Sequence, residues 1–240
     1  NDAAGEEIAK RLKQEGVSLQ FLEIDETAQT STSCLLTSST GEHTIVMYRG
    51  KNDDLLNVSP LWSELEKTKW LYLTDVASTS EELTLKVTEV AESKKINLAF
   101  VPGQYQIRLG KEFFSSVLKT CEIFILNRHE AETILGAGRG VEEMLQEFIK
   151  MGTKIAVITD DKNGVHAADG KQTYKQSAPP VEKPVDTTGA GDAFASGFVA
   201  ARISGKPVEE ALSWGNKNAG SVISQVGAQP GLLRTAAMKS

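Results

Sequence analysis

The sequence has few of the residues on which disulfide-rich folds and zinc centres depend. Its 240 residues include two cysteines, Cys34 and Cys121, and three histidines, His43, His129 and His166. The cysteines share no close spacing, which argues against a secreted disulfide scaffold and favours a reducing, cytoplasmic compartment. No histidine lies within a helical turn of another or beside a cysteine, so a histidine zinc site is not expected. The first residues are neither basic nor apolar, unlike a signal peptide.

Long apolar runs and an excess of positive charge are also missing. No run approaches the roughly 18 apolar residues that a membrane-spanning helix needs, so we expect no integral membrane protein. The 26 basic and 32 acidic residues give a net charge of −6, which offers no general attraction to nucleic acid or anionic lipid. The hydrophobic content of 40% is that of an ordinary globular chain, and the length favours one large domain.

The first fifty residues predict one helix and a small β element. Apolar residues recur at helical spacing over residues 3–15, and Gly16 is a suitable stop. Residues 30–37 and 43–48 have β-branched, alternating character and flank a polar turn, which predicts an antiparallel hairpin. We also expect a short strand over residues 19–24.

From residue 69 onward, strand patterns alternate with helix patterns. Strands are predicted at 70–74, 96–101, 123–126 and 154–159. Helices are predicted at 80–94, 110–119, 128–136 and 141–150. A second hairpin is predicted from residues 165–168 and 172–175. Strands separated by helices of this length are typical of βαβ units, so the sequence predicts an α/β fold with a parallel sheet.

The segment from Val185 to Phe198, VDTTGAGDAFASGF, carries the most chemical information. A glycine-rich turn that opens a helix presents unpaired N–H groups and the positive end of the helix dipole, which predicts a site for anionic oxygens. Asp192 falls in the first turn of that helix. It is either a general base, a role worth about 10²–10⁴ in rate, or a complement to the helix dipole, worth about 0.3–1 kcal/mol.

Two familiar phosphate-binding patterns do not fit this segment. The sequence contains no Gly-x-x-x-x-Gly-Lys-Ser/Thr, which excludes a P-loop enzyme. A dinucleotide fingerprint would need glycine or alanine where Phe194 stands, and residues 179–185 before it make a poor buried strand. A Rossmann dehydrogenase is therefore a weak alternative.

The run Asp186-Thr187-Thr188-Gly189-Ala190-Gly191-Asp192, followed by Gly197, resembles the C-terminal motif of the ribokinase-like (PfkB) sugar and nucleoside kinases. Three further segments resemble parts of the family: Asn127-x-x-Glu130, the run at 226–230 and the helix at 2–17. The resemblance therefore covers essentially the whole chain. It implies one domain over residues 1–240, a three-layer α/β/α sandwich with a small β lid at 30–50. It also implies transfer of the γ-phosphoryl group of ATP to a sugar hydroxyl.

The resemblance implies a role for each matching residue. Asp192 would be the base, and the N–H groups of Gly189, Ala190, Gly191 and Asp192 would form an anion hole. The residues implied to bind the nucleotide are Asn127, Thr159, Asp160, Asp161, Lys162, Asn163, Gly164, Gly191, Asp192 and Asn216. Asn127 and Glu130 would organise the Mg²⁺–triphosphate through water, although the same spacing is also that of a helix capping box. The family usually has glycine where Asp161 stands, so the backbone or charge near the phosphates is expected to differ.

Many family members also bind a monovalent cation beside the anion hole, so the resemblance implies K⁺ as a further cofactor. The implied ligands are oxygens of Asp186, Thr188, Val222, Gln225, Gly227 and Gly231. Oxygen ligands suit a hard cation. At the position of Gly231 a hydroxyl residue would contribute a ligand, whereas glycine supplies only its backbone carbonyl. Asp186 by itself is also typical of a turn.

The family's sugar-binding segments near its start, an Asp after the first strand and a Gly-Gly-x-x-x-Asn run, have no counterpart here. We therefore expect an N-terminally truncated kinase whose activity as a fragment is open. Three interpretations remain: a ribokinase-type sugar kinase, a nucleoside (adenosine-like) kinase in keeping with residues 100–104, and a non-catalytic nucleotide-binding protein. In the lid, Arg49 or Asn52 either contacts the sugar or lies in a solvated loop. The lid's exposed face suggests a homodimer.

Overall fold

The computed structural model describes residues 2–37, 43–48, 50, 59–75, 80–179, 181 and 184–238. Its main sheet has the strand order β3-β4-β5-β6-β7-β8. The strands are β3 (Trp70–Leu73), β4 (Asn97–Phe100), β5 (Cys121–Asn127), β6 (Ile155–Thr159), β7 (Val165–Ala168) and β8 (Thr173–Gln176). The first four run parallel, and β7 and β8 continue the sheet antiparallel. The predicted βαβ series and the second hairpin are confirmed.

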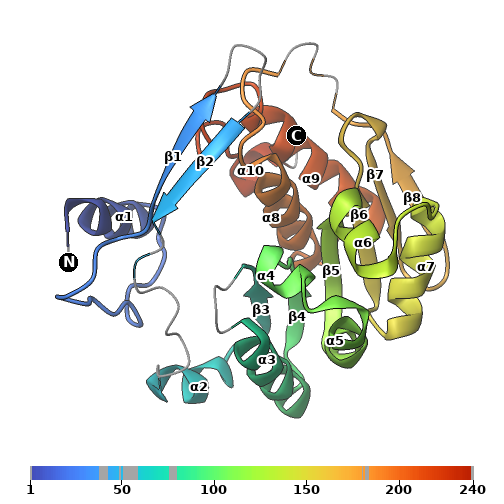
Figure 1. Ribbon diagram of the computed structural model, residues 1–240, viewed down its shortest axis with the longest axis horizontal. Helices are drawn as coiled ribbons and strands as arrows, with labels where there is room; N and C mark the ends of the chain where they lie inside the picture. The colour runs from blue at the N-terminus through green and yellow to red at the C-terminus, as the bar shows by residue number, and fades with distance from the viewer. Residues whose placement is uncertain are drawn as a thin grey trace.

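Helices cover both faces of this sheet, which confirms the three-layer α/β/α architecture (Figure 1). One layer contains α3 (Ser80–Lys94), α4 (Gln104–Ile107), α5 (Gly110–Val117), α6 (Arg128–Leu135) and α7 (Val141–Met151). The other contains α8 (Ala190–Ile203), α9 (Val208–Val222) and α10 (Thr235–Met238). The predicted helices of the first layer are confirmed, and the 3₁₀ turn Leu118–Thr120 continues α5. None of the described helices is long and apolar enough to cross a membrane.

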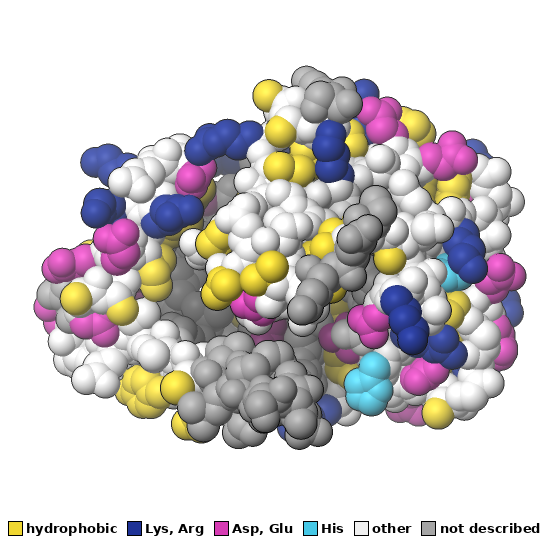
Figure 2. Space-filling view, turned by 90° about the horizontal axis from the view of Figure 1, so that it is seen from above, with side chains coloured by type: hydrophobic (Ala, Val, Ile, Leu, Met, Phe, Trp, Pro, Cys, Tyr) yellow, Lys and Arg dark blue, Asp and Glu magenta, His cyan; other side chains and the backbone are white. Residues whose placement is uncertain are grey.

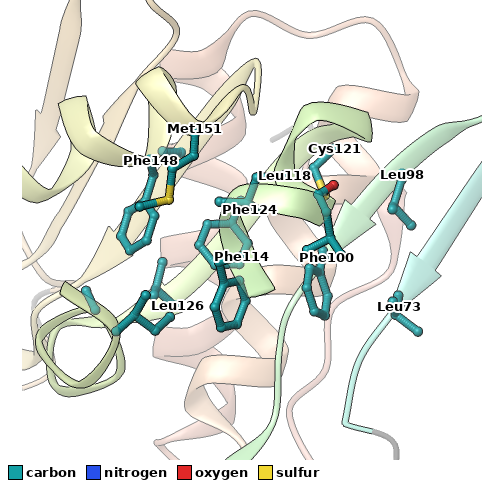
Figure 3. Close-up of a cluster of buried hydrophobic side chains, with 14 of the residues drawn as sticks. Leu73, Leu98, Phe100, Phe114, Leu118, Cys121, Phe124, Leu126, Phe148 and Met151 are labelled. Carbon is teal, nitrogen blue, oxygen red and sulfur yellow. The ribbon is translucent and has the colours of Figure 1, made fainter. Parts of the chain in front are cut away.

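Two hydrophobic cores hold the layers together, because neighbouring residues of each strand point to opposite faces. In β4, Leu98 and Phe100 join the core under α3–α7, whereas Ala99 joins the core under α8 and α9. The first core contains a chain of aromatic rings, drawn in Figure 3, whose centroids lie 5.1–6.0 Å apart. These rings belong to Phe100, Phe114, Phe124 and Phe148. Burial of each ring is worth roughly 1.5–3 kcal/mol, so β4 and β5 form a rigid base for the residues at their ends.

Helices α8 and α9 pack unusually closely because each has a glycine at the contact. A Cβ on Gly197 would lie 2.9 Å from the carbonyl oxygen of Trp214, and a Cβ on Gly215 would lie 2.6 Å from the Phe194 ring. Gly197 therefore serves helix packing. The contact fixes α8, whose N-terminus carries the motif, against α9.

The N-terminal part forms a helix and a separate two-stranded sheet. Helix α1 (Ala3–Gln14) begins at Asp2, whose carboxylate accepts the N–H of Gly5. Strands β1 (Thr32–Thr37) and β2 (His43–Tyr48) pair antiparallel, which confirms the hairpin, while its turn lies outside the described residues. A short helix, α2 (Ser59–Leu65), precedes β3.

The strand expected over residues 19–24 is wrong. This segment lies in neither sheet, and three of its apolar side chains are exposed: Phe21 by 45%, Leu22 by 44% and Ile24 by 64%. A β-strand needs a neighbour to pair its backbone N–H and C=O groups, and apolar residues in sequence do not supply one.

Candidate active site

The candidate site lies where the carboxyl ends of the parallel strands meet the N-terminus of α8, on the face that Figure 2 views from above. Asn127 ends β5 and Thr159 ends β6, and the two are direct partners in the sheet. A cavity of about 860 Å³ opens beside them. This volume is within the range of sites that hold small ligands, about 300–1,000 Å³.

The cavity brings together most residues that the sequence assigned to the nucleotide. Those that line it are Asn127, Thr159, Asp161, Lys162, Gly164, Gly191 and Asn216, together with Ala190. Asn216 also donates from Nδ2 to the carbonyl oxygen of Ser177, which joins α9 to the segment after β8. Asp160, Asn163 and Asp192 do not line the cavity. The carboxylate of Asp160 instead accepts from Arg128 at 3.1 Å and from Asn163 at 3.2 Å.

Asp161 has an unusual backbone conformation. Its φ angle of +43° lies in the left-handed region, which glycine adopts more easily than other residues. Asp161 is exposed and begins the 3₁₀ turn Asp161–Asn163 at the cavity wall. Compared with glycine at this position, Asp161 has a strained backbone and adds a negative charge to the cavity wall.

The N-terminus of α8 is shaped by Gly189. Its φ angle of +78° favours glycine, and a Cβ there would lie only 2.6 Å from the Cβ of Ala228. The N–H of Ala190 donates to the carbonyl of Thr187 at 3.2 Å. Within the described part of the chain, the N–H groups of Gly189, Gly191 and Asp192 have no hydrogen-bond acceptor. Three of the four expected anion-hole donors thus remain available to a ligand.

Gly191 differs from Gly189 in what surrounds it. A Cβ on Gly191 would meet no described atom within 4 Å, and its φ is ordinary. Neither packing nor backbone strain therefore requires glycine at position 191. Space for a ligand against the backbone is the remaining physical reason for its small size.

Asp192 lies exposed in the first turn of α8 and interacts with two groups from other elements. Burial, with a contribution from the Asp192 charge, raises the pKa of Tyr72 to about 12. Burial also raises the pKa of Glu130, and the negative charge of Asp192 adds to that effect. The sequence analysis missed Tyr72, although an aromatic residue at the carboxyl end of a predicted strand was a usable signal.

Asn127 and Glu130 form a reciprocal capping box at the start of α6. The Asn127 side chain accepts the N–H of Glu130 at 2.9 Å, and Glu130 Oε2 accepts the N–H of Asn127 at 2.8 Å. The capping interpretation of this pair is confirmed. Burial is the main cause of the raised pKa of Glu130, and the negative charge of Asp192 makes a smaller contribution in the same direction.

The residues expected around a monovalent cation are also drawn together. Asp186 accepts the N–H groups of Thr188 and Gly227, both at 2.9 Å. The N–H of Gln225 donates to the carbonyl of Val222 at 3.0 Å, and Gly231 packs so closely that a Cβ would lie 2.5 Å from the carbonyl oxygen of Ser221. The loop after α9 thus folds back on the turn before α8.

Comparison with known proteins identifies the family. A sequence profile described as "pfkB family carbohydrate kinase" matches residues 1–236. The chain belongs to the PfkB family. Family membership makes it a phosphotransferase of the kinase type that uses ATP.

Individual relatives of this PfkB-family protein include kinases for sugars and for nucleosides. Ribokinase of Bacillus subtilis is 27% identical over 97% of this chain and 75% of its own length. The structure of Arabidopsis thaliana ribokinase with ribose and ATP superimposes with a TM-score of 0.85 at 21% identity, covering 100% of this chain and 78% of that one. Adenosine kinase of Sinorhizobium meliloti has a TM-score of 0.83 at 26% identity, with coverages of 100% and 75%.

Two buried polar residues near the site escaped the sequence analysis. Asn218 donates from Nδ2 to the carbonyl of Ala193 at 2.7 Å and accepts the N–H of Leu233 at 2.8 Å. It therefore joins the first turns of α8 to α9 and to the C-terminal segment. Gln106 makes similar links on the other side of the site. Asn218 belongs to no local motif and only its burial reveals it, whereas Gln106 accepts the N–H of Gly103 at the start of α4, a local capping contact three residues apart.

Proposed function

We propose that this PfkB-family kinase transfers the γ-phosphoryl group of ATP to a hydroxyl of a small sugar. One observation carries the proposal. Asp192, an exposed carboxylate, lies in the first turn of α8 beside the N–H groups of Gly189 and Gly191, which have no acceptor in the described structure. A base and an anion site on one helical turn are what phosphoryl transfer to an alcohol requires.

The cavity would take the nucleotide, with its phosphates toward α8. Thr159, Lys162 and Asn216 offer polar groups along its wall, and Lys162 supplies positive charge. The helix N-terminus would stabilise the negative charge that develops on the transferred group. Asp192 would accept the proton of the attacking hydroxyl and hold that hydroxyl in line with the phosphorus atom.

Mg²⁺ would bind on the side of Asn127 and Glu130. The donor set fits a hard divalent cation, because it offers a carboxylate and an amide oxygen next to the triphosphate position. The negative charge of Asp192 contributes to the raised pKa of Glu130, so the two carboxylates repel one another. A cation bound near them and the phosphates would offset that repulsion. Asn127 and Glu130 would hold the ion through water, and the ion would supply neutralisation of the phosphate charge.

K⁺ would bind beside the anion hole. The oxygens assigned to it belong to Asp186, Thr188, Val222, Gln225, Gly227 and Gly231. The contacts of Asp186 with Thr188 and Gly227 support this assignment, because they hold the two loops at one place. Carboxylate, hydroxyl and carbonyl oxygens suit a hard cation.

The acceptor would approach Asp192 from the side of β3 and β4, opposite the nucleotide cavity. Tyr72 on β3 interacts with Asp192, whereas the cavity is lined from β5, β6 and α9. A nucleoside acceptor is the second candidate, supported by the 26% identity with an adenosine kinase. Arg49 and Asn52, which the sequence offers as sugar contacts, lie outside the described residues.

A homodimer through the two-stranded sheet is part of the proposal. Val46, Met47 and Tyr48 of β2 are 60%, 49% and 54% exposed. A two-stranded sheet is marginally stable alone, and a second copy would cover these side chains.

The two unpaired cysteines, Cys34 and Cys121, fit a reducing compartment such as the cytoplasm.

The experiment is a measurement of ADP formation with Mg·ATP and a panel of pentoses, hexoses, sugar phosphates and nucleosides. We expect ADP formation to depend on a sugar, and phosphorus NMR of the product identifies the hydroxyl. Dependence on a nucleoside instead would favour the second candidate. A thermal shift with Mg·ATP but no transfer to any acceptor would mean that the chain binds nucleotide without catalysis.

A further inference from the structure

Gln106 is a buried polar side chain that joins the ends of two neighbouring strands. It lies on α4 and is 0% exposed. Its Oε1 accepts the N–H of Gly103 at 2.7 Å. Its Nε2 donates to the carbonyl of Thr74 at 3.2 Å and to Thr84 Oγ1 at 3.4 Å. An amide in an apolar interior is retained only where its hydrogen bonds are made, so this geometry is specific.

The two segments that Gln106 links both belong to the carboxyl-end face of the sheet. Thr74 directly follows β3, and Gly103 follows β4 by three residues. The two segments also touch directly, because the side chain of Asp75 rests on Gly103. A Cβ on Gly103 would lie 2.1 Å from Asp75 Oδ1, so only glycine permits that contact.

This pair of segments lies on the Tyr72 side of Asp192. Thr74 and Gly103 follow the carboxyl ends of β3 and β4, which run parallel to β5, so they lie at the same edge of the sheet as Asn127. Tyr72 is two residues before Thr74, and the Asp192 charge contributes to its raised pKa. None of Thr74, Asp75 and Gly103 lines the nucleotide cavity. Under the proposed function, they therefore border the space through which the acceptor reaches Asp192.

We propose that Gln106 is a positioning residue for the acceptor. Its amide sets the spacing between the segments that follow β3 and β4, and so sets where the acceptor hydroxyl lies relative to Asp192. It makes no contact with the nucleotide cavity and does not act on ATP. This inference rests on the proposed function, because it assigns the β3–β4 side to the acceptor.

A purely structural role for Gln106 would give a different result. In that case, its replacement would lower the melting temperature and leave the kinetic constants of the folded enzyme unchanged. A positioning residue predicts a selective change in the constants for the acceptor. Small displacements of a substrate-positioning group lower kcat/KM by about 10- to 100-fold.

The test uses four variants of the full chain and the panel acceptor that the wild-type protein phosphorylates best. Gln106→Met removes all three hydrogen bonds, whereas Gln106→Glu keeps the acceptor for Gly103 and loses both donors. Thr84→Val removes only the bond to Thr84. Thr153→Val is the matched control: Thr153 is 2% exposed, and its hydroxyl donates to Cys121 and Ile155 at the opposite end of the sheet.

We expect Gln106→Met to raise the KM for the acceptor by about tenfold or more, with the KM for Mg·ATP within twofold of wild type. Gln106→Glu should show a smaller change in the same constant, and Thr84→Val should resemble wild type. Thr153→Val should lower the melting temperature alone. If Gln106→Met does not fold, Gln106→Glu carries the test.

Three outcomes would overturn the inference. The first is an unchanged acceptor KM in both Gln106 variants. The second is an equal rise in the KM values for acceptor and Mg·ATP. The third is a wild-type protein with no acceptor-dependent ADP formation, which overturns the proposed function as well. The first two outcomes leave the proposed function standing, so the two failures are distinguishable.

Discussion

The backbone N–H of Gly227 donates a 2.9 Å hydrogen bond to the carboxylate of Asp186, a residue 41 positions earlier in the chain. The same carboxylate accepts the N–H of Thr188 at 2.9 Å. One side chain therefore joins the turn before α8 to the loop after α9. Because Ala228 then packs against Gly189, the position of this loop also determines the shape of the helix N-terminus.

Asp186 is expected to be needed both for stability and for the response to K⁺. Asp186→Ala leaves two N–H groups without their acceptor and should lower the free energy of unfolding by about 1–3 kcal/mol. Each oxygen of Asp186 accepts one N–H, so Asp186→Asn keeps one of the two hydrogen bonds and removes the charge. It should lose less stability than Asp186→Ala and should also lose stimulation by K⁺. The measurement is ADP formation against KCl at constant ionic strength.

Asp169 provides the matched control for Asp186. It is also an aspartate in a turn, where it accepts the N–H groups of Lys171 and Gln172 at 3.0 Å, far from α8 in the β7–β8 hairpin. Asp169→Asn should leave the K⁺ response intact. Equal responses in Asp186→Asn and wild type would contradict the cation assignment.

Asp192→Asn should lower kcat by about 10²–10⁴ with little change in Mg·ATP binding, because it removes the proton acceptor and leaves the cavity intact. The control is Glu112→Gln, which removes an acidic residue from the first turn of α5. That change affects only the helix dipole, so activity should persist. Turnover by Asp192→Asn at the wild-type rate would refute the general-base role.

Gly189 and Gly191 should respond differently to replacement by alanine. Gly189→Ala forces a left-handed backbone onto alanine, at a cost of about 1–2 kcal/mol, and adds the clash with Ala228. Gly191→Ala meets open space within the protein and should keep or slightly raise the melting temperature while weakening Mg·ATP binding. Thermal unfolding with and without Mg·ATP measures both effects. Unchanged affinity in Gly191→Ala would argue against a ligand at that backbone.

His166 should make stability fall as the pH drops below its ordinary pKa of 6.5. Burial, aided by the charge of Lys175, lowers the pKa of His166 in the folded protein, while Asp160 and Glu142 oppose that shift. The unfolded chain therefore takes up a proton first. The stabilisation is present above pH 6.5 and is lost toward the lower folded-state pKa. Urea unfolding from pH 8 to pH 5 measures it, and His166→Gln should reduce the slope. An equal slope in both proteins would assign it to other groups.

Substitutions in β2 should separate the proposed dimer and identify the face that forms it. Successive residues of a strand point to opposite sides, so Val46 and Tyr48 share one face and Met47 belongs to the other. Aspartate at the interface face should give monomers, and aspartate at the other face should leave the dimer intact. Light scattering after size-exclusion chromatography gives the mass of each variant. A wild-type monomer at all concentrations would contradict the dimer.

The sequence predicted most of the fold because its signals are local. The spacing of apolar residues in β3–β6 and in the helices between them reflects which face each residue buries, and the structure confirms it. The strand expected at 19–24 is wrong because pairing with a neighbour is not a local property. The backbone at Asp161 has φ +43°, which glycine adopts more easily than aspartate, and this explains the glycine expected there from the family resemblance.

The sequence by itself determined the chemistry that we propose: a short run, Gly189–Asp192, contains both a glycine-rich helix start and a carboxylate in its first turn. Local spacing suffices for that, because helix geometry fixes the relation among four consecutive residues. Only the tertiary structure decided which distant groups surround that turn. Tyr72 from β3, Glu130 from α6 and the Asp186–Gly227 contact reach it through the crossover topology of the sheet and the close packing of α8 on α9. These contacts depend on how layers pack, which no single segment of sequence encodes.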